Sequence, residues 1–75
     1  MTELSALKTG RQATVDQLHV SGLLRRRILD LGIIPGVPIV CRGRAPSGDP
    51  IAYQVRGTIV ALRKADAGKI FVDHA

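Results

Sequence analysis

Side chains able to ligate a soft metal ion are few in this chain: one cysteine, Cys41, and two histidines, His19 and His74. A zinc site usually takes three or four protein ligands at a recognisable spacing, and these three residues have no such spacing. The aspartates are dispersed one at a time, at Asp16, Asp30, Asp49, Asp66 and Asp73. We therefore expect no metal site and no cofactor, and we interpret Cys41 as a small hydrophobic side chain of the core.

Residue patterns typical of catalysis are also missing from the sequence. No nucleophile has a base at a plausible spacing, and the eight glycines fall at predicted turns and strand bends, not in a phosphate-binding loop. The 75-residue chain has room for a thin core only, because a domain this short buries about 60% of the surface of its unfolded chain. We therefore predict a binding protein and not an enzyme.

Arginine is the most frequent charged residue of this chain and the side chain that we expect to bind a partner. Eight arginines and three lysines give a formal net charge of +5, which attracts acidic proteins, nucleic acid or an anionic membrane leaflet. We interpret Arg42, Arg44 and Arg56 as a basic patch on one outward face, suited to a position beside a membrane. A nucleic-acid-binding barrel usually presents several stacking aromatic residues, whereas this chain has only Tyr53 and Phe71.

The elements that must position these residues are mostly short strands. A helical turn is predicted over Ser5–Gly10, where Leu4 and Leu7 can plug one end of a barrel. The alternating pattern predicts strands over Ala13–Leu18, Pro38–Ala45, Ile51–Val55, Thr58–Leu62 and Lys69–Asp73, with a short turn over Lys64–Gly68. We predict one domain spanning residues 1–75. The element order β-α-β-β-β-β favours a mainly β fold, namely a small antiparallel barrel of about five strands with one inserted helix.

The inserted helix is predicted over Gly22–Leu31, because Ser21 is a good N-cap and Gly32 stands where helices end in a left-handed conformation. One arc of this helix holds the apolar side chains that we expect to be buried: Leu23, Leu24, Ile28 and Leu31. Arg27 falls inside the same arc. The opposite side carries Arg25, Arg26 and Leu29, which we expect to be exposed.

Two dipeptides predict sharp changes of chain direction. Pro35-Gly36 is typical of a turn, because proline fixes φ near about −65° and glycine accepts a positive φ. Arg56-Gly57 interrupts the strand pattern and predicts a bulge or bend of the kind that small barrels need to close. We therefore expect structural or partner-binding roles for Gly32, Gly36 and Gly57.

Four segments resemble the FeoA family, the ferrous iron transport protein A family. Arg26–Gly36 is similar to its RRLLDLGxxPG motif. Gly48–Pro50, Val55–Gly57 and Ala61–Arg63 follow in the family's order, and the resemblance extends from Leu4 to Val72. It implies an SH3-like barrel in a small cytoplasmic accessory protein of bacterial ferrous iron uptake. The implied partner is a FeoB-type membrane transporter, contacted at its cytoplasmic GTP-binding domain.

We expect the helix to dock on this partner, with Leu29 as an apolar anchor and Arg25 and Arg26 as its charged rim. The alternative is that Leu29 packs under the N-terminal turn while the arginines are solvated. For Arg27 we favour a structural role, with its stem lying along neighbouring leucines; a role as an arginine finger for the GTP-binding domain is the weaker alternative.

Two other functions remain open for such a barrel: nucleic-acid binding, and metal sensing related to the C-terminal domain of iron-dependent repressors. A proline-peptide groove is rejected, because it needs more aromatic side chains than this chain has. The apolar window Leu31–Cys41 is broken by glycine and proline and is shorter than the roughly 20 residues that span a bilayer. We therefore expect a cytoplasmic protein that meets the membrane through its partner, and an open edge strand would allow it to pair with a second copy.

Overall fold

The computed structural model describes residues 1–74 and contains six strands, two α-helices and one 3-10 turn. The strands are β1 (Thr2–Glu3), β2 (Gln12–Leu18), β3 (Pro38–Arg44), β4 (Ile51–Val55), β5 (Thr58–Leu62) and β6 (Ile70–His74). The 3-10 turn is η1 (Leu4–Ala6), and the helices are α1 (Gly22–Asp30) and α2 (Lys64–Ala67).

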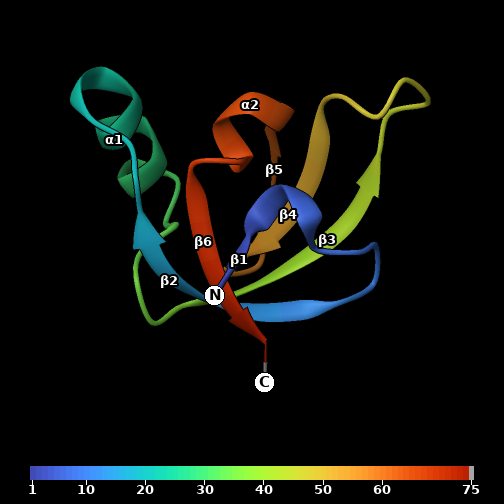
Figure 1. The fold of residues 1–75 in the computed structure, drawn as a ribbon, viewed down its shortest axis with the longest axis horizontal. Coiled ribbons are helices and arrows are strands. Elements are labelled where there is room, and N and C mark those ends of the chain that lie inside the picture. Colours follow the sequence, from blue (N-terminus) through green and yellow to red (C-terminus); the bar gives the residue numbers. More distant parts are fainter. Residues whose placement is uncertain (75) are drawn as a thin grey trace.

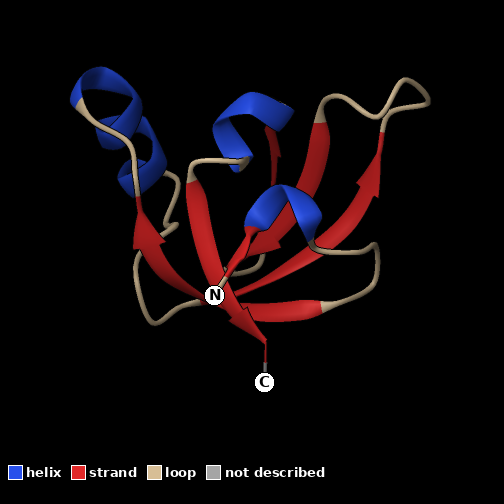
Figure 2. Ribbon diagram, viewed as in Figure 1, coloured by secondary structure: helices blue, strands red, loops and turns tan. Residues whose placement is uncertain are grey.

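All six strands belong to one antiparallel sheet in the order β1-β6-β2-β3-β4-β5. The sheet curls around the core (Figure 2), and shifts in register at Val15/Gln17 and at Cys41/Gly43 increase its bend, as bulges do. The predicted SH3-like, mainly β fold is therefore confirmed. The sixth strand, β1, is an addition to the prediction, since two residues are too few to produce an alternating pattern.

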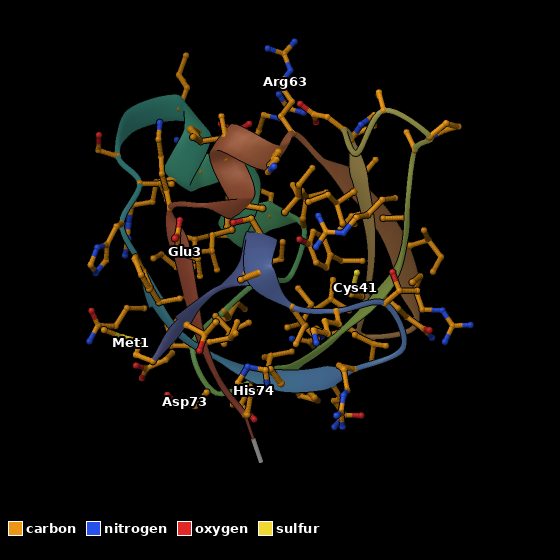
Figure 3. All side chains as sticks on the ribbon, turned by 45° about the vertical axis from the view of Figure 1, so that its right-hand side comes forward. Met1, Glu3, Cys41, Arg63, Asp73 and His74 are labelled. Carbon is orange, nitrogen blue, oxygen red and sulfur yellow. The ribbon has the colours of Figure 1, made fainter. Side chains whose placement is uncertain are left out.

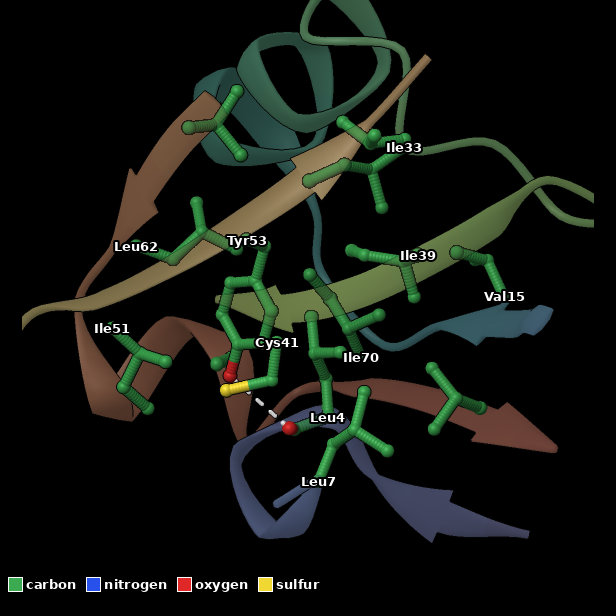
Figure 4. Close-up of a cluster of buried hydrophobic side chains, with 14 of the residues drawn as sticks. Leu4, Leu7, Val15, Ile33, Ile39, Cys41, Ile51, Tyr53, Leu62 and Ile70 are labelled. Atoms are coloured by element: carbon green, nitrogen blue, oxygen red, sulfur yellow. Dashed lines mark hydrogen bonds between the residues drawn. The ribbon is translucent and has the colours of Figure 1, made fainter. Parts of the chain in front are cut away.

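The core is aliphatic apart from a single tyrosine (Figure 4). Ile51, Tyr53 and Val55 of β4 are buried, and Cys41 of β3 is fully buried beside them, as predicted for a core side chain. Leu4 and Leu7 are also fully buried, so the N-terminal turn does plug one end of the barrel.

That N-terminal turn differs from its prediction in position. The helical residues are Leu4–Ala6, whereas Leu7 is already extended and Gly10, at φ +86°, begins the approach to β2. The predicted turn over Ser5–Gly10 is therefore wrong in its bounds. Its placement follows from the two leucines, because both side chains reach the core only if the helical turn lies between them.

The β4–β5 hairpin closes through Arg56 and Gly57, which have φ angles of 51° and 79°. A two-residue loop with positive φ at both positions matches the right-handed twist of the strands that it joins. This is the sharp bend predicted from the sequence. The turn after α1 also forms as predicted: Gly36 has φ +95° and donates its N–H to the carbonyl of Val15 at 2.7 Å.

Helix α1 begins and ends close to the predicted residues. Ser21 is its N-cap in an extended conformation, although its side chain makes no capping hydrogen bond. At the other end Gly32 has φ +91°; its N–H donates to the carbonyl of Leu29 at 2.9 Å, and Ile33 N–H donates to the carbonyl of Ile28 at 3.2 Å. These two bonds form a Schellman motif, which explains why glycine is needed there.

The predicted burial of α1 is wrong for three leucines. Leu23 and Leu31 were expected in the core, but they are 84% and 37% exposed. Leu29 was expected to be exposed and is half-buried. The physical reason is the position of α1 (Figure 1): it stands at one end of the barrel and does not lie across the sheet, so Ile28 is its one fully buried side chain.

Candidate functional site: a groove beside helix α1

A groove of about 940 Å³ lies between α1 and the end of the barrel. One wall is formed by the side of α1 that carries Leu24, Arg27, Ile28 and Leu31. The other wall comes from the β3–β4 loop, the end of β5 and the start of α2, and it consists of Ser47, Asp49, Pro50, Ala61, Leu62, Arg63 and Asp66. These elements gather at the same end of the molecule (Figure 1).

The wall opposite α1 is ordered by a hydrogen bond between distant segments. The backbone N–H of Lys64 donates to the Oδ1 carboxylate oxygen of Asp49 at 3.0 Å, which ties the β3–β4 loop to the first turn of α2. Leu62 forms the buried base beside this bond. The groove therefore has an apolar floor and one wall held in place.

The arginines of α1 are exposed, and one of them lines the groove. Arg25, Arg26 and Arg27 are all exposed, and none of them forms an ion pair within residues 1–74; of the three, Arg27 lines the α1 wall. Arg63 adds a positive charge on the opposite wall, where Asp49 and Asp66 carry negative charge, and it extends from that end of the molecule (Figure 3). The α1 side of the groove thus combines the unpaired Arg27 with the exposed leucine Leu31, a composition suited to a partner that is both apolar and acidic.

The structure separates the residues of the predicted docking face. Arg25 and Arg26 are exposed, as a charged rim requires, but the half-buried Leu29 is poorly placed to be their anchor. Arg27, for which we favoured a structural role, is exposed and lines the groove. Leu31, and not Leu29, is the exposed apolar side chain on the groove side of the helix, where an apolar anchor would be needed.

The predicted basic patch is divided among different environments. The Arg44 guanidinium donates to the backbone carbonyls of Ser5 at 2.7 Å and Leu7 at 3.1 Å, so it holds the N-terminal turn in place. The stem of Arg56 lies beside Gly32, with Cδ 3.2 Å from the position that a Cβ would take there. Arg42 is exposed on β3. Two of the three arginines therefore have structural contacts of their own.

The few soft ligands do not gather. Cys41 is buried inside the barrel, whereas His74 lies near the C-terminus (Figure 3). His19 is exposed; it forms a 2.8 Å hydrogen bond with Gln17, and its ring centroid is 4.6 Å from that of Phe71. Within residues 1–74 no three metal-ligating side chains form a cluster.

Within residues 1–74, Tyr53 is the one titratable group whose pKa is clearly shifted from its ordinary value. Burial raises the pKa of its phenol far above the ordinary value; the neighbouring Cys41 raises it further, while Arg44 lowers it. The hydroxyl donates to the carbonyl of Leu4 at 3.1 Å (Figure 4). Because the group stays neutral and is fully buried, it contributes to stability and is not a proton donor at a surface site.

Sequence reasoning did not find the wall opposite α1. Ser47, Asp49, Ala61 and Asp66 are unremarkable in the sequence, and they become neighbours through the pairing of β4 with β5 and the bond between Asp49 and Lys64. The one available signal was the resemblance itself, since Gly48–Pro50 and Ala61–Arg63 are two of its four segments. Among the described residues, no helix combines the length and apolar character needed to cross a membrane.

Comparison with known proteins confirms the resemblance. The FeoA domain model matches residues 2–74. The Fe(2+) transport protein A/Fe(2+) transporter FeoB fusion protein of Porphyromonas gingivalis strain W83 is 40% identical over 70 residues, which make up 93% of this chain and 8% of that relative. This chain thus spans a small part of the relative's length.

Two solved structures have the same fold. The solution structure of the FeoA protein of Chlorobium tepidum superposes with a TM-score of 0.92 at 34% identity, over 97% of this chain and 70% of that chain. The crystal structure of Stenotrophomonas maltophilia FeoA with zinc, described as a prokaryotic SH3 domain protein, has a TM-score of 0.79 at 34% identity, over 97% and 89% of the two chains. Fold, motifs and the match over residues 2–74 agree: this chain belongs to the FeoA family.

Proposed function

We propose that this chain is an accessory protein of ferrous iron uptake that binds the cytoplasmic part of a FeoB-type membrane transporter and supports its assembly or activity. The observation that carries the proposal is the Porphyromonas gingivalis relative, in which Fe(2+) transport protein A and the transporter FeoB form one polypeptide. Fusion keeps two domains at a high effective concentration, which is useful when the domains bind each other. We extend this association to the separate chain.

The groove beside α1 is the proposed contact surface. Leu31 offers an exposed apolar side chain there, Arg27 lines the same wall, and Arg25 and Arg26 are exposed elsewhere on the same helix. A partner surface with an apolar residue among carboxylates would be complementary in both respects. The partner's GTP-binding domain faces the cytoplasm, so the proposal also assigns this chain to the cytoplasm, next to the membrane through its partner.

A titration of the transporter's purified cytoplasmic domain into this chain tests the proposal, with binding heat as the readout. Leu31→Asp should weaken the complex at least tenfold, because the new carboxylate replaces the apolar anchor of the groove and loses about 1.4 kcal/mol or more of binding free energy. Leu23→Asp is the matched control: Leu23 is an exposed leucine of the same helix that does not line the groove. That variant should bind within about threefold of the wild type.

The result that contradicts the proposed surface is equal weakening by the two variants, or none by either. Absence of any binding by the wild-type chain would contradict the proposed function itself. Leu23 is 84% exposed, so Leu23→Asp should lower the folding stability by no more than about 0.5 kcal/mol. Leu31 is 37% exposed and is the C-cap of α1, so Leu31→Asp should cost more than that; a thermal melt of each variant checks that it is folded at the temperature of the titration.

A further inference from the structure

Strand β5 leaves one side of its backbone free to pair. It is the last strand of the sheet, and within residues 1–74 its neighbour is β4 alone. The register pairs Val55 with Thr58 across the two-residue turn, and hydrogen-bonded and non-hydrogen-bonded pairs alternate from there. The N–H and C=O groups of Ile59 and Ala61 therefore point away from β4.

The side chains of β5 alternate in the same way. Val60 and Leu62 are buried in the core, whereas Ile59 is 59% exposed and Ala61 is also exposed. Edge strands are usually protected by shortness, proline or a bulge. The opposite edge, β1, has only two residues, but β5 pairs regularly over five residues and contains neither proline nor a register shift.

This free edge and the groove belong to one surface. Ala61 and Leu62 of β5 line the groove together with Leu24 and Ile28 of α1. At the other end of β5, the hairpin turn reaches the C-terminal end of α1, where Arg56 contacts Gly32. An extended segment added to β5 would place its alternate side chains in the groove, and its backbone would bond to Ile59 and Ala61.

The charges around β5 indicate which segment fits. Arg56 precedes the strand, Arg63 and Lys64 follow it, and no carboxylate lies between them in the sequence. The carboxylates of the groove, Asp49 and Asp66, come from the β3–β4 loop and α2 and not from β5. Antiparallel pairing of two copies of β5 would bring basic residues opposite basic residues, which is unfavourable. An apolar strand with carboxylates at both ends would instead be attracted at each end.

We propose that β5 binds its partner by strand addition: an extended apolar segment of the transporter's cytoplasmic part, flanked by acidic residues, joins the sheet at the edge formed by Ile59 and Ala61. This inference rests on the proposed function and specifies how the same groove is used. It assigns the recognition to backbone groups of β5, with α1 covering the side chains of the added strand.

Substitution by proline tests the backbone contact directly. Ala61→Pro removes an N–H that points away from β4, so the ladder within this chain is retained while the added strand loses a donor and meets the proline ring. The matched control is Ala61→Val, which keeps the N–H and suits a strand. Titrated with the transporter's purified cytoplasmic domain, Ala61→Pro should bind at least tenfold more weakly than Ala61→Val. The difference between Ala61→Val and the wild type measures the separate effect of the side chain that lines the groove.

A second measurement uses the wild-type chain and does not depend on how the variant folds. Amide hydrogen exchange, followed by NMR with and without the transporter domain, should show at least tenfold slower exchange for Ile59 and Ala61 in the complex. Val60 is the internal control, because its N–H already pairs with β4 in the free chain.

The outcomes separate the two proposals. If the transporter domain binds the wild-type chain but Ile59 and Ala61 exchange at unchanged rates, or if Ala61→Pro binds as tightly as Ala61→Val, strand addition is overturned and the proposed function stands. If the domain does not bind the wild-type chain at all, both proposals are overturned. Slower exchange with selective loss of binding by Ala61→Pro supports strand addition.

Discussion

Tyr53 illustrates how single residues hold this fold together. It is the one tyrosine of the chain; it fills the barrel, and its hydroxyl satisfies the Leu4 carbonyl of the N-terminal turn. Arg44 bonds the same segment from outside, at the carbonyls of Ser5 and Leu7. Together these side chains anchor η1 over the end of the barrel.

Tyr53→Phe should lower the free energy of unfolding by about 1 kcal/mol at neutral pH, because the buried Leu4 carbonyl loses the hydroxyl donor and keeps only the N–H of Leu7. The sign of the pH dependence follows from the raised pKa of Tyr53. An acid with a raised pKa in the folded state stabilises the fold below its unfolded pKa of about 10 and loses that contribution as the pH rises further. Urea unfolding from pH 8 to pH 11 should therefore show the difference between wild type and Tyr53→Phe shrinking above about pH 10. A difference that stays constant to pH 11 would contradict the burial of the phenol.

Residue positions on strands were the most predictable part of the chain. The strand Ile51–Val55 was predicted from its alternating pattern, because a repeat of two residues shows which side chains share a face of the sheet. Cys41 was assigned to the core as a small hydrophobic side chain, and it is buried there. Leu23 and Leu31 were misplaced for a physical reason. Five leucine or isoleucine side chains surround most of α1, so the pattern alone cannot decide which part of its circumference contacts the barrel.

At the scale of elements, the sequence predicts the ends of α1 better than it predicts which face of α1 is buried. Gly32 fixes the C-terminal end through a left-handed conformation and two backbone hydrogen bonds, and its side of the helix also contacts the Arg56 stem. Such local chemistry is visible in the sequence. The groove and the free edge of β5 are not, because they depend on strand order and on which elements meet at one end of the barrel.

Gly32→Ala should destabilise the chain by about 1–2 kcal/mol, the usual cost of a left-handed conformation for a residue with a Cβ. The Cβ added at position 32 would also lie close to Cδ of Arg56. Because the Arg56 side chain is flexible and can move aside, Gly32→Ala should lower the stability by nearly the same amount in an Arg56→Ala background. Gly43→Ala is the matched control, since Gly43 lacks a positive φ and a Cβ there would have open space. Chemical denaturation should find Gly43→Ala within about 0.5 kcal/mol of the wild type; an equal loss in both glycine variants would refute the role of Gly32 as the C-cap.

At the scale of the whole molecule, the proposed contact surface is formed by several elements. The groove that Arg27, Leu31 and Arg63 line adjoins the unpaired edge of β5, and the family relative in Porphyromonas gingivalis joins Fe(2+) transport protein A and FeoB in one polypeptide. We infer from these features that a transporter segment completes the sheet. Salt should then weaken the complex without abolishing it, because screening removes the attraction between charges but leaves the apolar contacts.

Equilibrium binding of the fluorescently labelled chain to the intact transporter in lipid nanodiscs is the most direct measurement. We predict a saturable one-to-one complex whose affinity falls as the salt concentration rises from about 0.05 to 0.5 M. Empty nanodiscs of the same lipid composition, serving as the control, should give no saturable binding. Equal binding to empty and transporter-containing nanodiscs, or no saturable binding at either salt concentration, would contradict the account.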